Sequence, residues 1–289
     1  MQRRDFLLAA GQTAAAGLLA TAVSHHGHVR AATTERKIKV GQIGTAHAHA
    51  GGKMDALRKL TDQYEVVGVV EPDAALREAA MRQAVYRGLR WMTEEELLNT
   101  PGLQAVAVET AVRDLIPTAA RCVAAGMHLH LDKPAGASLP AFKKVLDEAA
   151  RQKLTIQMGY MFRNNPAFQF CFRAVREGWL GEVFEVHAVI SKKDPDSQRL
   201  RLAEFSGGSM FELGCHVIDA TVAVMGRPER VTPFLRRTRP DLDTLADNTL
   251  AVLEYPRATC TVRSSLIEFE GGQRRQFVVC GDKGTIDIR

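Results

Sequence analysis

Short strand-like segments alternate with helical segments through the first half of this chain, and this alternation constrains the fold more than any other feature. The strand-like segments are residues 37–43, 65–70, 103–108, 128–131 and 155–158. The helical segments are residues 52–60, 74–84, one beginning near residue 93, 117–125 and one beginning after residue 138. The alternation predicts an α/β fold, a Rossmann-type doubly wound sheet of parallel strands.

Two of the expected helices begin with recognisable capping residues. Thr93 precedes Glu96 by three residues, the spacing of a capping box. Ser138 precedes Pro140, which is favoured in the first turn of a helix. Both patterns fix the start of a helix directly after a strand or loop.

The pattern changes after residue 155. We expect helices at residues 166–177 and 209–225, a basic loop at 192–201, and strands at 183–190, 249–255, 258–266, 276–280 and 285–288. Closely spaced strands of this kind predict an α+β domain with an open, mostly antiparallel sheet. The expected domains are residues 1–34, an export signal and linker, 35–155, a dinucleotide-binding domain, and 156–289, a substrate and oligomerisation domain.

The first residues have the pattern of an export signal. Arg3 and Arg4 are followed by an Ala- and Leu-rich stretch from Phe6 to Val23. Paired arginines at this place are typical of the twin-arginine signal, which is read by a translocase that carries folded proteins. We expect an exported, periplasmic protein, with an uncleaved membrane anchor as the alternative.

Charge and cysteine content argue against two other classes of protein. Arg3, Arg4, Arg30 and Asp5 account for +2 of the net charge of +5, and the remaining +3 is too small and too dispersed for a nucleic-acid surface. The five cysteines are widely spaced and form no C-x-x-C pair, so we expect small core residues rather than disulfides.

The first chemical motif is the turn after the first strand. Gly44 supplies the tight turn that lets backbone N–H groups face a pyrophosphate, although Ala46 replaces the second glycine of the usual pattern. Glu71 ends the second strand, where a carboxylate binds the adenosine ribose and repels a 2′-phosphate. The turn therefore favours NAD over NADP, and a generic β–α turn with an incidental acid is the alternative.

The same turn contains two histidines. His47 and His49 could be metal ligands together with His128 and His130. A third ligand close in sequence is missing, so the sequence predicts no metal.

The second motif is Asp132-Lys133-Pro134, after the fourth strand. A lysine at the carboxyl end of a parallel strand lies where open α/β sheets bind ligands. Beside a cationic nicotinamide its ammonium would lose protons more easily, as a general acid or base requires. A Lys-Pro turn of purely structural importance is the alternative.

The third motif lies on the helix expected at residues 209–225. Glu212, His216 and Asp219 have the spacing i, i+4 and i+7, which places them on one polar stripe. In the alternative, Ser209 and Glu212 form a capping box and Glu212 is structural.

Together these motifs resemble the glucose-fructose oxidoreductase, inositol dehydrogenase and rhizopine-catabolism (Gfo/Idh/MocA) family. The resemblance runs from about residue 37 to residue 289 and includes the stretches 44–47, 132–134, 159–166 and 207–219. It implies a Rossmann domain, then an α+β domain whose sheet supports homo-oligomerisation, with NAD(P) between them.

The resemblance also implies roles for individual residues. The catalytic residues would be Lys133, His216 and Glu212. The cofactor-binding residues would be Gly44, Thr45, Ala46, His47, Glu71, Thr110, Asp132, Lys133, Pro134 and Arg163. The substrate-binding residues would be Tyr160, Arg163 and Asp219.

Several positions depart from the family pattern. Asp132 replaces a Glu, Glu212 replaces an Asp, and Leu115 stands where a His is common. The chain ends at Arg289, where family members usually continue, so we expect a truncated second domain.

The sequence thus predicts an exported NAD-dependent oxidoreductase acting on a CH–OH group of a sugar, polyol or related carbohydrate. His216 would take the hydroxyl proton, Lys133 would stabilise the alkoxide and Glu212 would orient His216. An NAD-dependent glycosidase working through transient oxidation, and a non-catalytic sugar sensor or scaffold, are the alternatives.

Overall fold

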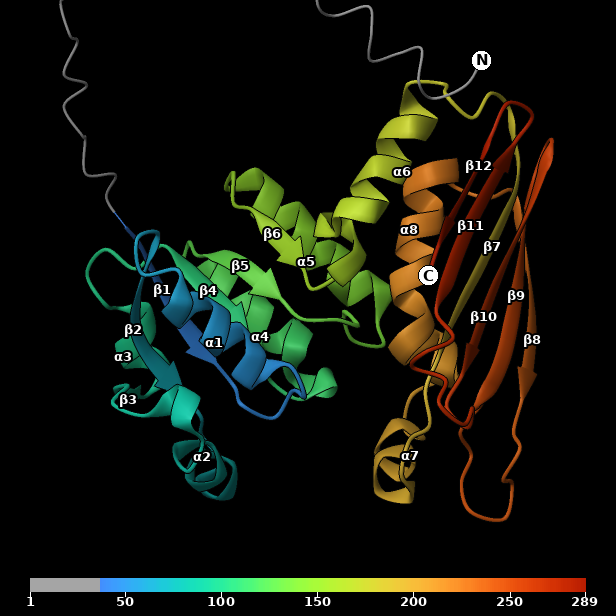
Figure 1. The fold of residues 1–289 in the computed structure, drawn as a ribbon. Coiled ribbons are helices and arrows are strands. Elements are labelled where there is room, and N and C mark those ends of the chain that lie inside the picture. Colours follow the sequence, from blue (N-terminus) through green and yellow to red (C-terminus); the bar gives the residue numbers. More distant parts are fainter. Residues whose placement is uncertain (1–36) are drawn as a thin grey trace, which may run out of the picture. The chain divides into compact units, whose positions relative to one another are not determined.

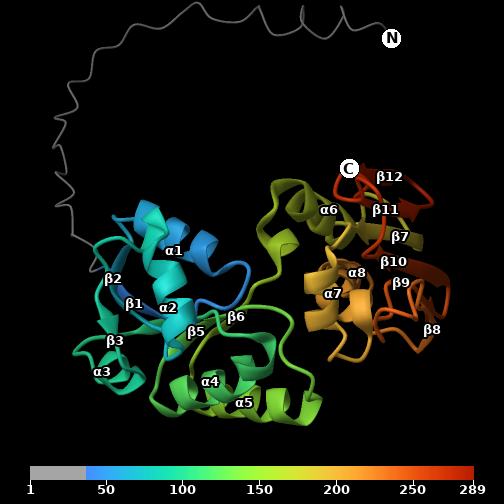
Figure 2. The ribbon, with the colours of Figure 1, turned by 90° about the horizontal axis from the view of Figure 1, so that it is seen from below.

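The computed structural model describes residues 37–289, so the predicted export signal lies outside the described part of the chain. The first half contains β1 (Ile38–Ile43), α1 (Ala50–Lys59), β2 (Tyr64–Val70), α2 (Ala74–Met81), η1 (Ala84–Tyr86), β3 (Trp91–Met92), α3 (Glu94–Leu98), β4 (Ala105–Val108), α4 (Val112–Ala124), β5 (His128–Leu131), α5 (Leu139–Arg151) and β6 (Ile156–Met158). The six strands form one parallel sheet in the order β3-β2-β1-β4-β5-β6. Helices α1 and α2 cover one face and α4 and α5 the other (Figure 2). The predicted Rossmann fold is confirmed.

Local capping signals begin two of these helices as predicted. Thr93 Oγ1 accepts a hydrogen bond from the Glu96 N–H at 3.1 Å, and the Glu96 carboxylate accepts one from the Thr93 N–H at 2.8 Å. Ser138 Oγ accepts a hydrogen bond from the Ala141 N–H at the start of α5. These bonds satisfy N–H groups that a helix start leaves without partners.

Strand register decides which residues meet at the carboxyl edge of this sheet. Ile43 pairs with Val70 and with Val108, and Val108 pairs with Leu131. The residues that follow these four strand ends therefore lie side by side, namely Gly44, Glu71, Glu109 and Asp132. Strand order reverses between β1 and β4, and ligands bind at such a point in open α/β sheets.

The second half forms an α+β domain (Figure 1). It contains η2 (Met161–Asn164), α6 (Pro166–Arg176), β7 (Val183–Ser191), α7 (Asp196–Leu202), the π-helical turn η3 (Met210–Gly214), α8 (Cys215–Met225), β8 (Arg230–Arg236), β9 (Asn248–Tyr255), β10 (Ala258–Ser265), β11 (Gln276–Gly281) and β12 (Thr285–Ile288). The sheet order is β12-β11-β7-β10-β9-β8, and only the pairing of β7 with β10 is parallel. The predicted mostly antiparallel sheet is confirmed, whereas α7 replaces part of the predicted loop and β8 is an additional strand.

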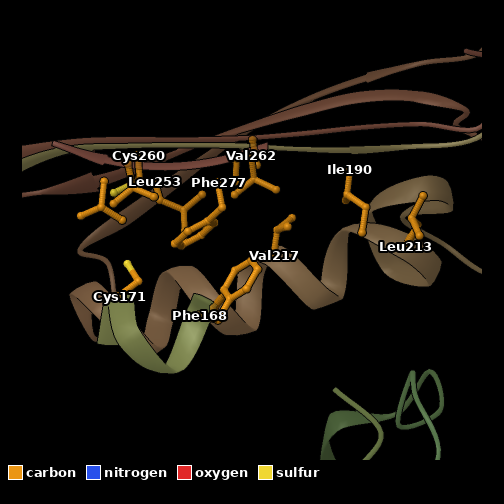
Figure 3. Close-up of a cluster of buried hydrophobic side chains, with 14 of the residues drawn as sticks. Phe168, Cys171, Ile190, Leu213, Val217, Leu253, Cys260, Val262 and Phe277 are labelled. Atoms are coloured by element: carbon orange, nitrogen blue, oxygen red, sulfur yellow. The ribbon is translucent and has the colours of Figure 1, made fainter. Parts of the chain in front are cut away.

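Helices α6 and α8 pack against one face of this second sheet (Figure 3). Residues alternate between buried and partly exposed along β9, as expected when one face of a sheet is covered. Phe168, Val217, Val262 and Phe277 are among the buried side chains that fill the space between helices and sheet. Each buried side chain of this size contributes about 1.5–3 kcal/mol relative to exposure.

Three of the five cysteines are core residues, as the sequence predicts, whereas Cys215 and Cys280 are only partly buried. Cys122, Cys171 and Cys260 are buried and free. Among residues 37–289, no helix combines the length and apolar character needed to cross a membrane.

Candidate active site

The turn after β1 requires glycine. Gly44 donates its N–H to the Val70 carbonyl at 2.8 Å and has a φ of +91°. A Cβ at this position would lie 2.6 Å from backbone atoms of Thr110, which follows β4. Only glycine lets the ends of β1 and β4 approach this closely. No side chain at this position then fills the space at the edge of the sheet where a dinucleotide would bind.

Glu71 holds this turn in place. Its Oε2 accepts hydrogen bonds from the Thr45 N–H at 2.7 Å and from the Thr45 hydroxyl at 2.8 Å. Its Oε1 accepts a hydrogen bond from the Asp73 N–H at 3.1 Å. The carboxylate, which the sequence suggested as a ribose ligand, is 5% exposed and directed mainly at the turn.

Two adjoining cavities follow the carboxyl edge of the sheet. The first, here called the edge cavity, has a volume of 430 Å³, and its lining includes Gly44, Ala46, Glu71, Asp73 and Thr110. The second, here called the lysine cavity, has a volume of 500 Å³, and its lining includes Ala46, His47, Lys133, Pro134, Arg201 and Glu212. Ala46 and Leu76 line both cavities. A glycine turn beneath two joined cavities fits the two halves of a dinucleotide.

Lys133 is the buried cation of the lysine cavity. It is 2% exposed, and its Nζ donates a hydrogen bond to the Glu212 carbonyl at 2.8 Å. The same Nζ lies 3.4 Å from Glu212 Oε1, while Lys192 Nζ lies 3.1 Å from Glu212 Oε2. Burial alone would raise the pKa of Glu212, but the charges of the two lysines lower it. Glu212 is therefore an anion held between two ammonium groups.

These contacts change the role expected for Glu212. Its side chain is hydrogen-bonded to Lys133 and forms an ion pair with Lys192, and no hydrogen bond to His216 is present among the described residues. The alternative, a capping box of Ser209 and Glu212, does not form, because Ser209 Oγ donates to the Ser264 carbonyl and does not cap the π-helical turn. Glu212 thus positions Lys133 rather than the imidazole.

His216 lies in the first turn of α8 and is 3% exposed. Burial lowers the pKa of His216 to about 3, and the positive charge of Lys133 adds to this effect. The Tyr160 ring meets the imidazole edge-on, with ring centroids 6.1 Å apart. His216 is accordingly neutral at physiological pH and able to accept a proton or a hydrogen bond.

The remaining predicted substrate residues lie beside His216 and bind one another. The Arg163 guanidinium donates two hydrogen bonds to the Asp219 carboxylate, at 2.8 and 2.5 Å. Its Cζ carbon lies 5.8 Å from the centre of the Tyr160 ring, and burial raises the pKa of Tyr160 to about 12. Arg163 and Asp219 thus form an ion pair that orders the surroundings of Tyr160.

Histidines and carboxylates form a second polar group below the turn. We call His47, His49, Glu109, His130 and Asp132 the histidine–carboxylate cluster. Asp132 Oδ2 lies 3.3 Å from His47 Nδ1 and 3.1 Å from His49 Nδ1. His128, which the sequence suggested as a fellow ligand, instead accepts a hydrogen bond from the Thr155 N–H.

The two carboxylates of this cluster differ in acidity. Burial and the neighbouring Asp132 raise the pKa of Glu109. Burial acts in the same direction on Asp132, but its hydrogen bond with His49 and the charge of His47 lower its pKa overall. Sequence reasoning missed Glu109, although an acid directly after an apolar strand was the signal that pointed to Glu71.

Helix α7 forms one wall of the lysine cavity through Gln198, Arg201 and Leu202. Arg199 on this helix is 1% exposed. Its guanidinium donates hydrogen bonds to Asp243 at 3.0 and 3.1 Å and to Asp247 at 2.8 Å. This buried ion triad fixes the wall to the loop before β9.

Known proteins are similar to this chain in sequence and in fold. A family model described as "Oxidoreductase family, NAD-binding Rossmann fold" matches residues 38–160, and one described as "GFO/IDH/MocA C-terminal domain" matches residues 168–287. The uncharacterized oxidoreductase ORF334 of Rhizobium meliloti is 28% identical over 245 residues, which cover 84% of this chain and 68% of that protein. The scyllo-inositol 2-dehydrogenase (NADP(+)) IolW of Bacillus subtilis is 24% identical, covering 83% of this chain and 66% of that protein.

A solved structure has a similar fold. The WlbA dehydrogenase from Bordetella pertussis, in complex with NADH and UDP-GlcNAcA, superposes with a TM-score of 0.76 at 18% identity. The match covers 88% of this chain and 74% of that chain. The chain thus spans about two thirds to three quarters of the length of these three proteins.

Proposed function

Because this chain belongs to the GFO/IDH/MocA family of oxidoreductases, we propose that it transfers hydride between NAD and a hydroxyl-bearing carbon of a sugar, polyol or related carbohydrate. The observation that carries the proposal is the lysine cavity at the carboxyl edge of a Rossmann sheet, where the buried Lys133 is hydrogen-bonded to the Glu212 carbonyl, four residues before His216. The nicotinamide, when bound, accepts or donates the hydride.

Each residue of the site has a distinct task in this proposal. His216, neutral because it is buried, takes the proton of the substrate hydroxyl. Lys133 stabilises the negative charge that develops on that oxygen. Glu212 is a positioning residue, because its carbonyl and carboxylate hold the Lys133 ammonium in place.

Support for NAD rather than NADP comes from the edge cavity. Its lining contains Glu71, Asp73, Glu94 and Asp114 with Arg121, and Arg121 is already paired with Glu94. A 2′-phosphate would add negative charge to these surroundings, whereas a ribose hydroxyl can donate a hydrogen bond to a carboxylate. The relative IolW is named as an NADP(+) enzyme, so the two cofactors must be compared directly.

Export, partners and assembly are further parts of the proposal. The twin-arginine pattern supports export of the folded protein by the translocase, to the periplasm in a two-membrane cell. Homo-oligomerisation through the second sheet is supported by the exposure of Val231, Phe234 and Leu235 on its edge strand β8. The comparisons lend no support to the glycosidase or sensor alternatives.

Turnover measurements with matched variants test the proposed chemistry. A panel of sugars and polyols is screened by NADH formation, and Lys133→Met and His216→Ala are then assayed on the best substrate. Each should lower kcat by about 100-fold or more, the usual effect of losing a positioned acid or base. Lys192→Met, which touches the same Glu212 carboxylate from the other side, should lower kcat by less than about tenfold. Near-normal turnover of His216→Ala would refute the proposed proton transfer.

A further inference from the structure

The histidine–carboxylate cluster contains a buried carboxyl group, that of Glu109, with no lysine or arginine of the described residues beside it. Glu109 is 0% exposed, and no N–H or O–H group of the described residues donates a hydrogen bond to its carboxyl oxygens. No lysine or arginine within residues 37–289 pairs with it, and the charge of Lys53 acts on it only from a distance. A carboxyl group buried in this way is stabilised as an anion only when a cation lies beside it, so the cluster is a favourable place for a bound cation.

The histidines around Glu109 present lone pairs rather than hydrogens. His47 Nε2 lies 3.0 Å from the Lys133 carbonyl, which can only accept, so this nitrogen carries the hydrogen and the neutral ring has its lone pair on Nδ1. That Nδ1 lies 3.9 Å from Glu109 Oε2 and 3.3 Å from Asp132 Oδ2. Its one hydrogen-bond donor within the described chain is the His49 N–H, at 3.3 Å.

The same holds on the other side of the carboxylate. His130 Nδ1 lies 3.4 Å from the Gln157 side-chain oxygen and therefore carries the hydrogen. His130 Nε2 is buried, has no hydrogen-bond partner in the part of the chain that the structure describes, and lies 3.8 Å from Glu109 Oε1. The lone pairs of His47 Nδ1 and His130 Nε2 thus lie beside the Glu109 carboxyl group, and Asp132, which accepts a hydrogen bond from the Lys133 N–H, lies next to them. A cation would stabilise this arrangement.

We propose that the histidine–carboxylate cluster binds a divalent transition-metal ion, with zinc as the reference. His47, His49 and Asp132 offer ligand atoms within 4.8 Å of one another, and so do Glu109, His130 and Asp132. Zinc with ligands at about 2.0–2.1 Å places neighbouring ligand atoms roughly 3.3 Å apart, close to the spacings around Asp132. Imidazole and carboxylate donors suit zinc and related first-row metals.

Two further features fit such an ion. The Lys133 carbonyl that accepts the His47 hydrogen orients the ring as the outer partner of a metal-bound histidine does. The ion would join the turn at residues 44–49 to the ends of β4 and β5 and so fix the floor of the lysine cavity. The inference does not depend on the hydride-transfer proposal, because it concerns only binding of the metal.

The test is zinc binding by the full-length chain after treatment with EDTA. Zinc is titrated in competition with a chromophoric chelator, and one tightly bound equivalent is expected. Glu109→Gln, which keeps the shape of the side chain, and His49→Ala, whose side chain is 45% exposed, should each weaken binding at least tenfold. His128→Ala, on the same strand as His130 but outside the cluster, should bind zinc as the unmodified protein does.

Two further measurements guard against other sites and against misfolding. Replacing His25, His26 and His28 together by Ala should leave the tight equivalent intact. Cobalt(II) in place of zinc should give visible absorption bands, and the Glu109→Gln substitution should alter them. In a separate unfolding measurement, zinc should raise the unfolding midpoint of the wild type more than that of His49→Ala. The proposal would be overturned if the protein bound no zinc tightly, or if the triple variant lost the tightly bound zinc. It would also be overturned if Glu109→Gln and His49→Ala bound zinc with the affinity of the wild type.

Discussion

The pH dependence of stability should carry the signature of one buried imidazole, that of His216. Burial holds the pKa of this group at about 3 in the folded protein, against an ordinary value of about 6.5 in the unfolded chain. Between these two values the unfolded chain binds a proton that the folded protein does not. The free energy of unfolding therefore falls as the pH is lowered from 6.5 towards 3, and it is unaffected by this group above and below that window.

The size of the effect follows from the shift. Each pH unit inside the window costs about 1.4 kcal/mol, so lowering the pH from 6.5 to 4.5 should cost about 2 kcal/mol once partial titration at the upper end is included. His216 is 3% exposed, so solvent screening does not reduce this figure. His216→Gln removes the titrating group and should remove this part of the acid sensitivity.

The assay is urea unfolding of wild type and His216→Gln at pH 6.5 and 4.5, with EDTA present throughout. Other groups titrate in both proteins, so only the difference between the two pH dependences is compared. The wild type should lose about 2 kcal/mol more than the variant over this interval. His128→Gln, a substitution at an exposed position on β5, serves as the control and should not reproduce the effect. Parallel pH dependences of wild type and His216→Gln would refute the buried neutral imidazole.

Three further outcomes are expected at the turn and at the amino terminus. The amide of Glu71→Gln can no longer accept every hydrogen bond of the native carboxylate, so the free energy of unfolding in urea should fall by about 1–3 kcal/mol. The variant should also bind NAD more weakly in fluorescence titrations. In the same titrations, tighter binding of NADP than of NAD by the wild type would contradict the cofactor assignment. Gly44→Ala places a Cβ against the Thr110 backbone at an unfavourable φ and should cost about 1–3 kcal/mol in the same unfolding assay, whereas wild-type stability would contradict the close approach. Arg3→Lys with Arg4→Lys should retain the protein in the cytoplasm in cell fractionation, and unchanged export would indicate the general secretory route.

Local signals predicted the elements of the first domain well, because capping residues and apolar runs act over a few neighbours. The missed elements depend on tertiary contacts. Strand β8 contains Pro233, which disfavours a central strand, yet β8 lies at the edge of the sheet, where proline is tolerated. Helix α7 has only seven residues, and its buried Arg199 finds its partners more than forty residues later in the chain.

In the candidate site too, contacts between neighbours in sequence could be predicted, whereas contacts between distant segments could not. The stripe of Glu212, His216 and Asp219 places three polar residues near one another, but the π-helical turn and Lys133 decide what Glu212 binds. No pattern within one segment relates His47 to Glu109, because strand register alone brings them together. Acids directly after neighbouring parallel strands are the sequence signal that would find such a cluster.

The buried ion triad makes helix α7 a natural place for redesign of ligand selectivity. Arg199 anchors the helix from beneath, so substitutions on its cavity side need not shift its backbone. Gln198 and Arg201 line the lysine cavity from this anchored helix. A combinatorial library confined to these two positions would change the shape and charge of the cavity wall while leaving the proton-transfer residues untouched. Substitutions at Asp243 or Asp247 would remove partners of Arg199 and make helix α7 less rigid. They would thereby reduce the selectivity of the cavity between ligands, although both residues are distant from α7 in the sequence.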